Sequence, residues 1–146
     1  MADQLHPFAS VTGIEFLPSL QAAATGVLER YVTGFQPALG RQALVVSKQG
    51  DMLQQDLRDA DIIFVHATYM PATLIDALGE KIVTCKPSAR FILISRGFFG
   101  SPSFDCVEQL EYTNAWKTTS ICYIYQLKPQ AVAQAASKAR ARFELA

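Results

Sequence analysis

Short, continuous runs of apolar residues that alternate with helical segments constrain the fold of this chain more than any other feature. Four such runs lie near residues 10–15, 43–47, 61–66 and 90–95. Runs of this length without polar alternation predict strands buried on both faces, as in a parallel sheet covered by helices on either side. The pattern therefore predicts an α/β, Rossmann-like fold with a mostly parallel sheet.

Two helices are predicted between these strands, and each begins at a proline, either Pro18 or Pro71. Proline is favoured in a first helical turn because the N–H that it lacks has no partner there in any case. Apolar residues at helical spacing follow each proline. They are Leu20, Ala24, Val27, Leu28 and Tyr31 in the first helix, and Leu74, Leu78 and Ile82, with Ile75 beside them, in the second.

The pattern changes after the fourth run. Two β-prone stretches, Val107–Tyr112 and Thr118–Leu127, are joined by a short segment that contains Trp116. Because this connection is too short for a helical crossover, the two stretches predict an antiparallel hairpin at the end of the sheet, with Trp116 packed against it. Residues 1–128 are then expected to form one domain, and 129–146 an alanine-rich helical tail.

Composition excludes several classes of protein. Lys plus Arg and Asp plus Glu both number 13, so the formal net charge is zero and gives no general sign of nucleic-acid binding. The basic residues near the chain's end, Lys138, Arg140 and Arg142, suit a helix dipole, with a nucleic-acid contact as the alternative left open. The three cysteines form no C-x-x-C pair, so neither a disulfide framework, a zinc site nor any other metal site is expected.

Neither an apolar run long enough to span a membrane nor the pattern of a signal peptide is found in the sequence. An intracellular location, cytoplasmic or nuclear, is therefore expected.

Three segments, in this order, resemble class I S-adenosylmethionine (SAM)-dependent methyltransferases. Val11–Glu15 resembles the second strand of that class, and Gly50–Leu53 resembles its adenine-binding loop. The stretch from Ala60 to Pro87 resembles the fourth strand, its helix and the following turn. Within the class, the sequence is most similar to the disruptor-of-telomeric-silencing group, the histone-lysine methyltransferases without a SET domain. The resemblance covers roughly residues 8–127.

The resemblance implies roles for individual residues. Glu15 would accept hydrogen bonds from the ribose hydroxyls of SAM, Asp51 would contact the adenine, and Met52 would pack on its ring. His66 and Tyr69, after the fourth strand of the class, are the candidates for the catalytic site, and Tyr69 could line a channel for lysine. The implied reaction is methyl transfer to a lysine of a protein substrate.

Two departures weaken the expected activity. The first strand of the class and its glycine-rich loop, which holds the methionine part of SAM, are not found before His6, and His66-Ala67 replaces an asparagine. We therefore expect impaired catalysis and weak SAM binding. A non-catalytic binding or interaction module is the alternative. A nicotinamide-type Rossmann enzyme is less suitable, since it also needs a glycine-rich loop.

The missing strand also has a consequence for the sheet. In this class it lies between the strands that Val11–Ile14 and Asp61–Val65 resemble, and each buried orphan backbone group costs about 1–3 kcal/mol. Three interpretations stay open. The sequence is an incomplete product of a longer gene, the flanking strands pair with each other, or a partner fills the gap. Exposed apolar edges recruit further strands, so we expect the chain alone to be marginally stable and to self-associate.

Overall fold

The computed structural model describes residues 6–113, 118–134 and 137. The chain divides into two compact units, Met1–Gln55 and Asp56–Ala146, and each is described by itself. None of the helices in the described part of the chain is long and apolar enough to cross a membrane. The expected position of Trp116 and the basic residues from Lys138 onward lie outside the described residues.

The first unit is built on two parallel strands, β1 (Ser10–Glu15) and β2 (Leu44–Gln49). Their register pairs Ser10 with Leu44 and Glu15 with Gln49, so both strands end at the same edge. Three helical segments connect them, namely α2 (Pro18–Arg30), a π-helical turn η1 (Tyr31–Phe35) and α3 (Gln36–Ala38). Both predicted strands and the helix start at Pro18 are confirmed.

The first unit has a small core. Of the apolar positions predicted to line its helix, Tyr31 is 2% exposed, whereas Leu20 is 52% and Val27 49% exposed. Polar contacts supply part of the packing. The Ser47 hydroxyl of β2 donates to the Gln21 side chain of α2 at 2.9 Å, and the buried Gln36 amide donates to the Ala43 carbonyl at 2.7 Å.

The second unit holds a four-stranded sheet in the order β3-β4-β6-β5. The strands are β3 (Ile62–His66), β4 (Arg90–Ile94), β5 (Phe104–Thr113) and β6 (Thr119–Leu127). β3 and β4 are parallel, whereas β6 is antiparallel to both β4 and β5. The predicted parallel pair and the antiparallel hairpin are confirmed. The hairpin's first strand begins earlier than predicted, at Phe104, and contains a bulge between Cys106 and Glu108.

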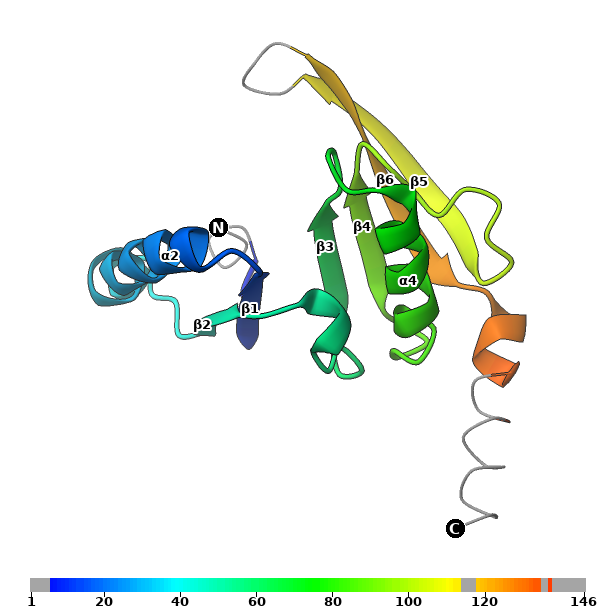
Figure 1. Cartoon of the computed structure of the whole chain (residues 1–146). Coiled ribbons are helices and arrows are strands. Elements are labelled where there is room, and N and C mark those ends of the chain that lie inside the picture. The colour runs from blue at the N-terminus through cyan, green and yellow to red at the C-terminus, as the bar shows by residue number, and fades with distance from the viewer. Residues whose placement is uncertain (1–5, 114–117, 135–136, 138–146) are drawn as a thin grey trace. The chain divides into compact units, whose positions relative to one another are not determined.

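Helix α4 (Ala72–Ile82) covers one face of this sheet (Figure 1). Its buried residues are Ile75, Leu78, Gly79 and Ile82, so Ile75 belongs to the core stripe and the half-buried Leu74 lies beside it, the reverse of the predicted order. Phe98 and Phe104 lie within 3.7 Å of the position that a Cβ at Gly79 would take. The core of the second unit also contains several aromatic side chains, and these are Phe91, Phe98, Phe104, Tyr123 and Tyr125.

Within the second unit, no helix among the described residues covers the opposite face of this sheet. The strand register places Phe64 beside Ile92 on that face, and Phe64 is 62% and Ile62 44% exposed. The prediction of strands buried on both faces is therefore wrong for β3, since a sheet face is buried only when another layer packs on it. β1 belongs to the two-stranded sheet of the first unit, and β3 is an outer strand of the four-stranded sheet of the second unit.

From Pro129 to Gln134 the chain is helical, as predicted for the start of the tail.

Candidate functional site

Two acidic residues, Glu15 and Asp51, lie in the first unit near the ends of β1 and β2. Glu15 is the last residue of β1 and Gln49, its partner, is the last residue of β2. The Gly50 N–H donates to the Glu15 carbonyl at 2.9 Å, which ties the turn carrying Asp51 to the end of β1. The carboxyl ends of neighbouring parallel strands are where α/β proteins bind ligands. Glu15 and Asp51, both predicted to bind the cofactor, therefore lie near the same edge of this sheet.

Short local hydrogen bonds orient both side chains. Asp51 precedes a 3-10 turn, η2 (Met52–Gln54), and its Oδ1 accepts the Leu53 N–H at 2.8 Å, as an N-cap residue does. Glu15 Oε1 accepts the Leu17 N–H at 2.8 Å, at the start of the connection to α2. Glu15, Asp51 and Met52 are all half-buried. Each carboxylate keeps acceptor capacity beyond these bonds, because a carboxylate has about four lone-pair sites.

This arrangement fits the nucleoside part of SAM. Ribose hydroxyls and an adenine amine are donors, and the two carboxylates are acceptors, while Met52 offers an apolar surface for the ring. The residues described before β1 are His6-Pro7-Phe8-Ala9 and include no glycine. The first unit therefore offers groups for the nucleoside part of SAM.

The second unit places His66 and Tyr69 where β3 ends. Tyr69 is 97% exposed, so its ring packs against very little in the described part of the chain. His66 is also exposed, and its Nδ1 lies 3.2 Å from Thr68 Oγ1. Thr68 in turn hydrogen-bonds to the Ser95 hydroxyl, 27 residues away, at 3.0 Å.

Sequence reasoning missed Thr68 and Ser95. Ser95 directly follows the fourth predicted strand, and the carboxyl ends of β3 and β4 lie side by side, as the pairing of His66 with Ile94 shows. The position of Ser95 directly after a predicted parallel strand could have identified it, because polar residues after parallel strands gather at one edge of the sheet.

Other polar groups of the second unit have structural roles. Asp61, expected to begin a strand and do no chemistry, immediately precedes β3 and accepts a hydrogen bond from Lys86 Nζ at 2.9 Å. Cys85 is buried and donates from Sγ to the Leu57 carbonyl, and its burial raises the pKa of the thiol. Among the residues that the structure describes, no group of three or more His, Cys, Asp or Glu side chains could hold a metal ion.

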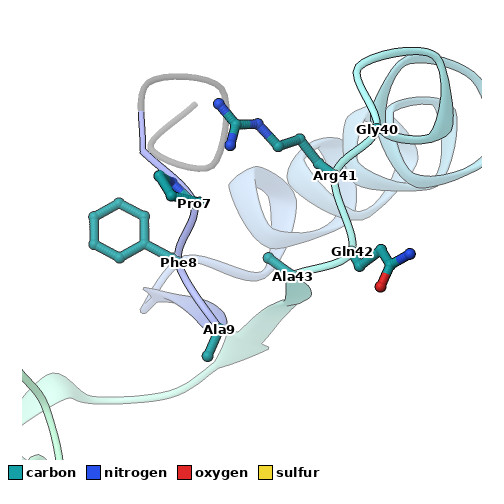
Figure 2. Close-up of a pocket in the computed structure, with 7 residues that line it drawn as sticks. All are labelled: Pro7, Phe8, Ala9, Gly40, Arg41, Gln42 and Ala43. Atoms are coloured by element: carbon teal, nitrogen blue, oxygen red, sulfur yellow. The ribbon is translucent and has the colours of Figure 1, made fainter.

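A hollow of about 280 Å³ lies in the first unit, at the amino ends of β1 and β2 (Figure 2). Its lining includes Phe8 and Ala9 before β1, and Arg41 and Ala43 before β2. In Figure 2 the Gln42 and Phe8 side chains point to opposite sides. Because ligands of parallel sheets bind at the carboxyl ends, this hollow does not belong to the Glu15–Asp51 site.

No protein-family model matches the sequence, and no curated protein shows significant similarity to it. Several solved structures do resemble the chain. Sp1610 from Streptococcus pneumoniae, described as a candidate tRNA (m1A22) methyltransferase, gives a TM-score of 0.55 at 12% identity. The match covers 82% of this chain and 53% of that one, so the chain spans about half the length of this structure.

Two further structures are more distant. The glycopeptide N-methyltransferase MtfA, complexed with S-adenosylhomocysteine, gives a TM-score of 0.46 at 16% identity, over 86% of this chain and 61% of that one. The tRNA methyltransferase TrmK from B. subtilis gives 0.46 at 13% identity, over 84% and 62%. At such identities the likeness concerns the fold alone. The chain has the mixed α/β fold of Rossmann-like, SAM-dependent methyltransferases.

Proposed function

We propose that the chain is the SAM-binding part of a methyltransferase that transfers a methyl group to a nitrogen atom. The observation that carries the proposal is that two acids, Glu15 and Asp51, lie near the same end of two parallel strands, where the Gly50 N–H donates to the Glu15 carbonyl. Bound SAM would supply an electrophilic methyl group on its sulfonium. Glu15 would accept hydrogen bonds from the ribose hydroxyls, Asp51 would accept one from the adenine, and Met52 would pack on the ring.

The acceptor that we propose is a lysine side chain of a protein. The support is the sequence likeness to the disruptor-of-telomeric-silencing group. Sp1610, described above, is named for methyl transfer to tRNA, so the choice of lysine rests on the sequence likeness. Tyr69 is almost fully exposed, which leaves its aromatic face available to a cationic amine. His66 lies three residues before it, at the end of β3.

A non-catalytic binding module is the second candidate. The specific observation in its favour is that Tyr69, a candidate for the catalytic site, is 97% exposed and packs against very little in the described part of the chain. In that case the Glu15–Asp51 pair would bind a nucleoside or another polyol without methyl transfer.

Calorimetry with SAM tests the proposal. We expect weak binding, with a dissociation constant in the micromolar range or above, because Glu15, Asp51 and Met52, the three residues named above, would contact only the nucleoside end. Glu15→Ala removes hydrogen bonds to a charged group, worth about 1.5–3 kcal/mol, and should weaken binding about 10- to 100-fold. Glu29→Ala removes an exposed acid of α2 in the same unit and should leave binding unchanged.

Two outcomes would contradict it. Sub-micromolar binding that Glu15→Ala does not change would place SAM elsewhere on the chain. Adenosine binding equal to that of SAM, with no methyl transfer to lysine peptides, would favour the binding module.

A further inference from the structure

Two exposed aromatic rings and an unpaired cation lie beyond the ends of β3 and β4 in the second unit (Figure 1). Tyr69, in the connection from β3 to α4, is 97% exposed, and Phe99, in the connection from β4 to β5, is 70% exposed. Arg96, also between β4 and β5, is exposed, and its side chain has no ion-pair or hydrogen-bond partner among the residues that the structure describes. Within this unit all three side chains are therefore accessible to a ligand.

The two connections are tied to each other directly after the strands. Thr68 Oγ1 lies 3.0 Å from Ser95 Oγ. Tyr69 follows the first of these residues and Arg96 follows the second, so the ring and the guanidinium come from adjoining stretches of backbone. The Ser95 N–H also donates to the Ile121 carbonyl of β6 at 2.7 Å. The sheet therefore holds the starts of both connections in place relative to each other.

Phe99 belongs to the same end of the sheet. Its ring lies perpendicular to the ring of Tyr123 in β6, with centroids 5.1 Å apart, and Tyr123 pairs with Leu93 near the end of β4. Between Leu93 and Phe99 the backbone turns at Ser95, whose φ of 68° is left-handed. Such backbone is strained at a residue with a side chain, and strained residues cluster at functional sites.

Exposed rings beside an unpaired guanidinium match the chemistry of a single-stranded nucleic acid. An unstacked base has a flat face that stacks on an aromatic side chain, and each linkage between nucleosides carries a phosphate that a guanidinium binds. An apolar protein surface would cover the rings but leave the charge of Arg96 without a counter-ion. Since the formal net charge of the chain is zero, the attraction to phosphate is local to this end of the sheet.

We propose that Tyr69, Arg96 and Phe99 bind a short segment of single-stranded RNA, with bases stacked on the two rings and a phosphate on the guanidinium. RNA is the nucleic acid in which unpaired bases are commonly offered for recognition. This binding does not rest on the proposed function, because it needs neither SAM nor Glu15 and Asp51. It shares Tyr69 with the lysine acceptor proposed above, so a lysine peptide would compete with RNA for that ring.

Fluorescence anisotropy tests the proposal with a labelled single strand of 12 adenylates, titrated with the full chain. We expect binding at low salt, and the logarithm of the association constant should fall by about 0.7 for each tenfold rise in salt, as for one phosphate contact to a single strand. A GC-rich RNA duplex of the same length should bind at least about tenfold more weakly, because its bases are stacked on one another and offer no free face.

Variants of the two rings test the stacking. Tyr69→Leu and Phe99→Leu should each weaken binding of the single strand about 5- to 150-fold, the effect of losing one stacked base. Tyr112→Leu is the matched control, because it removes a ring that is 37% exposed on β5, away from the two connections, and should leave binding unchanged. Circular dichroism should show that all three variants are folded, since the rings are exposed.

Variants of two arginines at opposite ends of β4 test the phosphate contact. Arg96→Gln should weaken binding several-fold and bring the salt dependence close to zero. Arg90→Gln makes the same change in net charge at the first residue of β4, and it should keep the wild-type salt dependence. Equal effects of the two substitutions would overturn the assignment of the phosphate to Arg96.

Three other results would overturn the proposal. They are a single strand that does not bind, a duplex that binds as tightly as the single strand, and ring variants that bind like the wild type. A lysine peptide that binds while the single strand does not would overturn RNA binding and support the acceptor proposed above. Failure of SAM to bind in calorimetry would overturn the proposed function and leave the RNA measurements as they are.

Discussion

The two outer strands of the four-stranded sheet, β3 and β5, differ in every property that distinguishes an edge strand from an interior one. β5 is exposed at each residue from Asp105 to Thr113, carries three acids and contains a bulge. β3 reads Ile-Ile-Phe-Val-His, without a carboxylate, lysine, proline or bulge, although its Phe64 is 62% exposed. Charges and bulges are the devices by which natural edge strands avoid further pairing.

For β5, the position at the edge of the sheet agrees with a sequence typical of an edge strand. For β3, the position and the sequence disagree. β5 is an edge strand in both respects. β3 has the continuous apolar sequence of a strand with neighbours on both sides, yet it pairs with β4 alone among the described residues. An unprotected edge of this kind is expected to recruit another strand.

The largest effect that we expect is on self-association of the chain through β3. In an antiparallel pair of two β3 strands, Phe64 at the centre of the five residues would face its own copy. Phe64→Lys removes two apolar side chains, each worth about 1.5–3 kcal/mol when buried, and opposes two like charges. Its dissociation constant for dimers should therefore rise at least about 100-fold. Light scattering after size-exclusion chromatography measures this.

Leu110→Lys is the matched control, because Leu110 is 46% exposed on β5, the protected edge. It should leave the dissociation constant within about threefold. A wild-type chain that is monomeric at all concentrations, with a cooperative thermal melt, would show that β3 does not mediate self-association. The contrast drawn between the β3 and β5 edges would then be wrong.

A smaller effect is expected in the interior of the sheet, beside β6. A Cβ at Gly97 would collide with the Tyr125 hydroxyl, and it would lie 3.1 Å from the Tyr125 ring carbon Cζ that carries this hydroxyl. The ring cannot move freely, since it is 3% exposed and packs on Phe98 with centroids 5.2 Å apart. Gly97→Ala should therefore destabilise the chain by about 2 kcal/mol.

Chemical denaturation measures the loss, and a double mutant identifies its cause. In the Tyr125→Phe background, Gly97→Ala should destabilise the chain by about 1 kcal/mol less, because the hydroxyl oxygen that the new Cβ collides with is absent. Equal losses in both backgrounds would show that the collision with the hydroxyl is not the reason. Substitutions at exposed β5 positions should stay within about 0.5 kcal/mol, which sharpens the contrast between interior and edge.

The smallest effect that we expect is a pH dependence of stability caused by Tyr125, and it is absent at neutral pH. Burial raises the pKa of Tyr125 to about 12, from an ordinary value of 10.0. The unfolded chain releases this proton at lower pH than the folded chain does. The stabilisation is therefore complete below the ordinary value and is lost as the pH rises from 10.0 to about 12.

Over that interval the melting temperature of the wild type should fall by a few degrees more than that of Tyr125→Phe. The tyrosinate absorbance of the wild type should contain a last step near the raised pKa, and this step should be absent from the variant. Equal pH profiles of the two proteins would show that the Tyr125 hydroxyl is not protected by its burial.

Much of the fold follows from the sequence, because local patterns specify local structure. The apolar runs predicted the strands to within a few residues, the prolines marked the helix starts, and the short segment around Trp116 predicted an antiparallel hairpin. Glu15 and Asp51 could be placed together because parallel strands end at one edge. The order of Leu74 and Ile75 in the core stripe could not be predicted, since adjacent apolar residues on a helix differ by a rotation that only the packed sheet decides.

The sequence by itself determined that this is an α/β chain with strands made for a covered sheet, with Glu15 and Asp51 at the end of two of them. Only the tertiary structure decided which faces are covered and which side chains meet. Within the second unit it left Phe64 on a sheet face that none of that unit's described helices covers, and it joined His66 to Ser95 through Thr68. The physical reason is that periodicity reports how residues are arranged along one element. Burial and hydrogen bonding across the sheet depend on which other elements pack there.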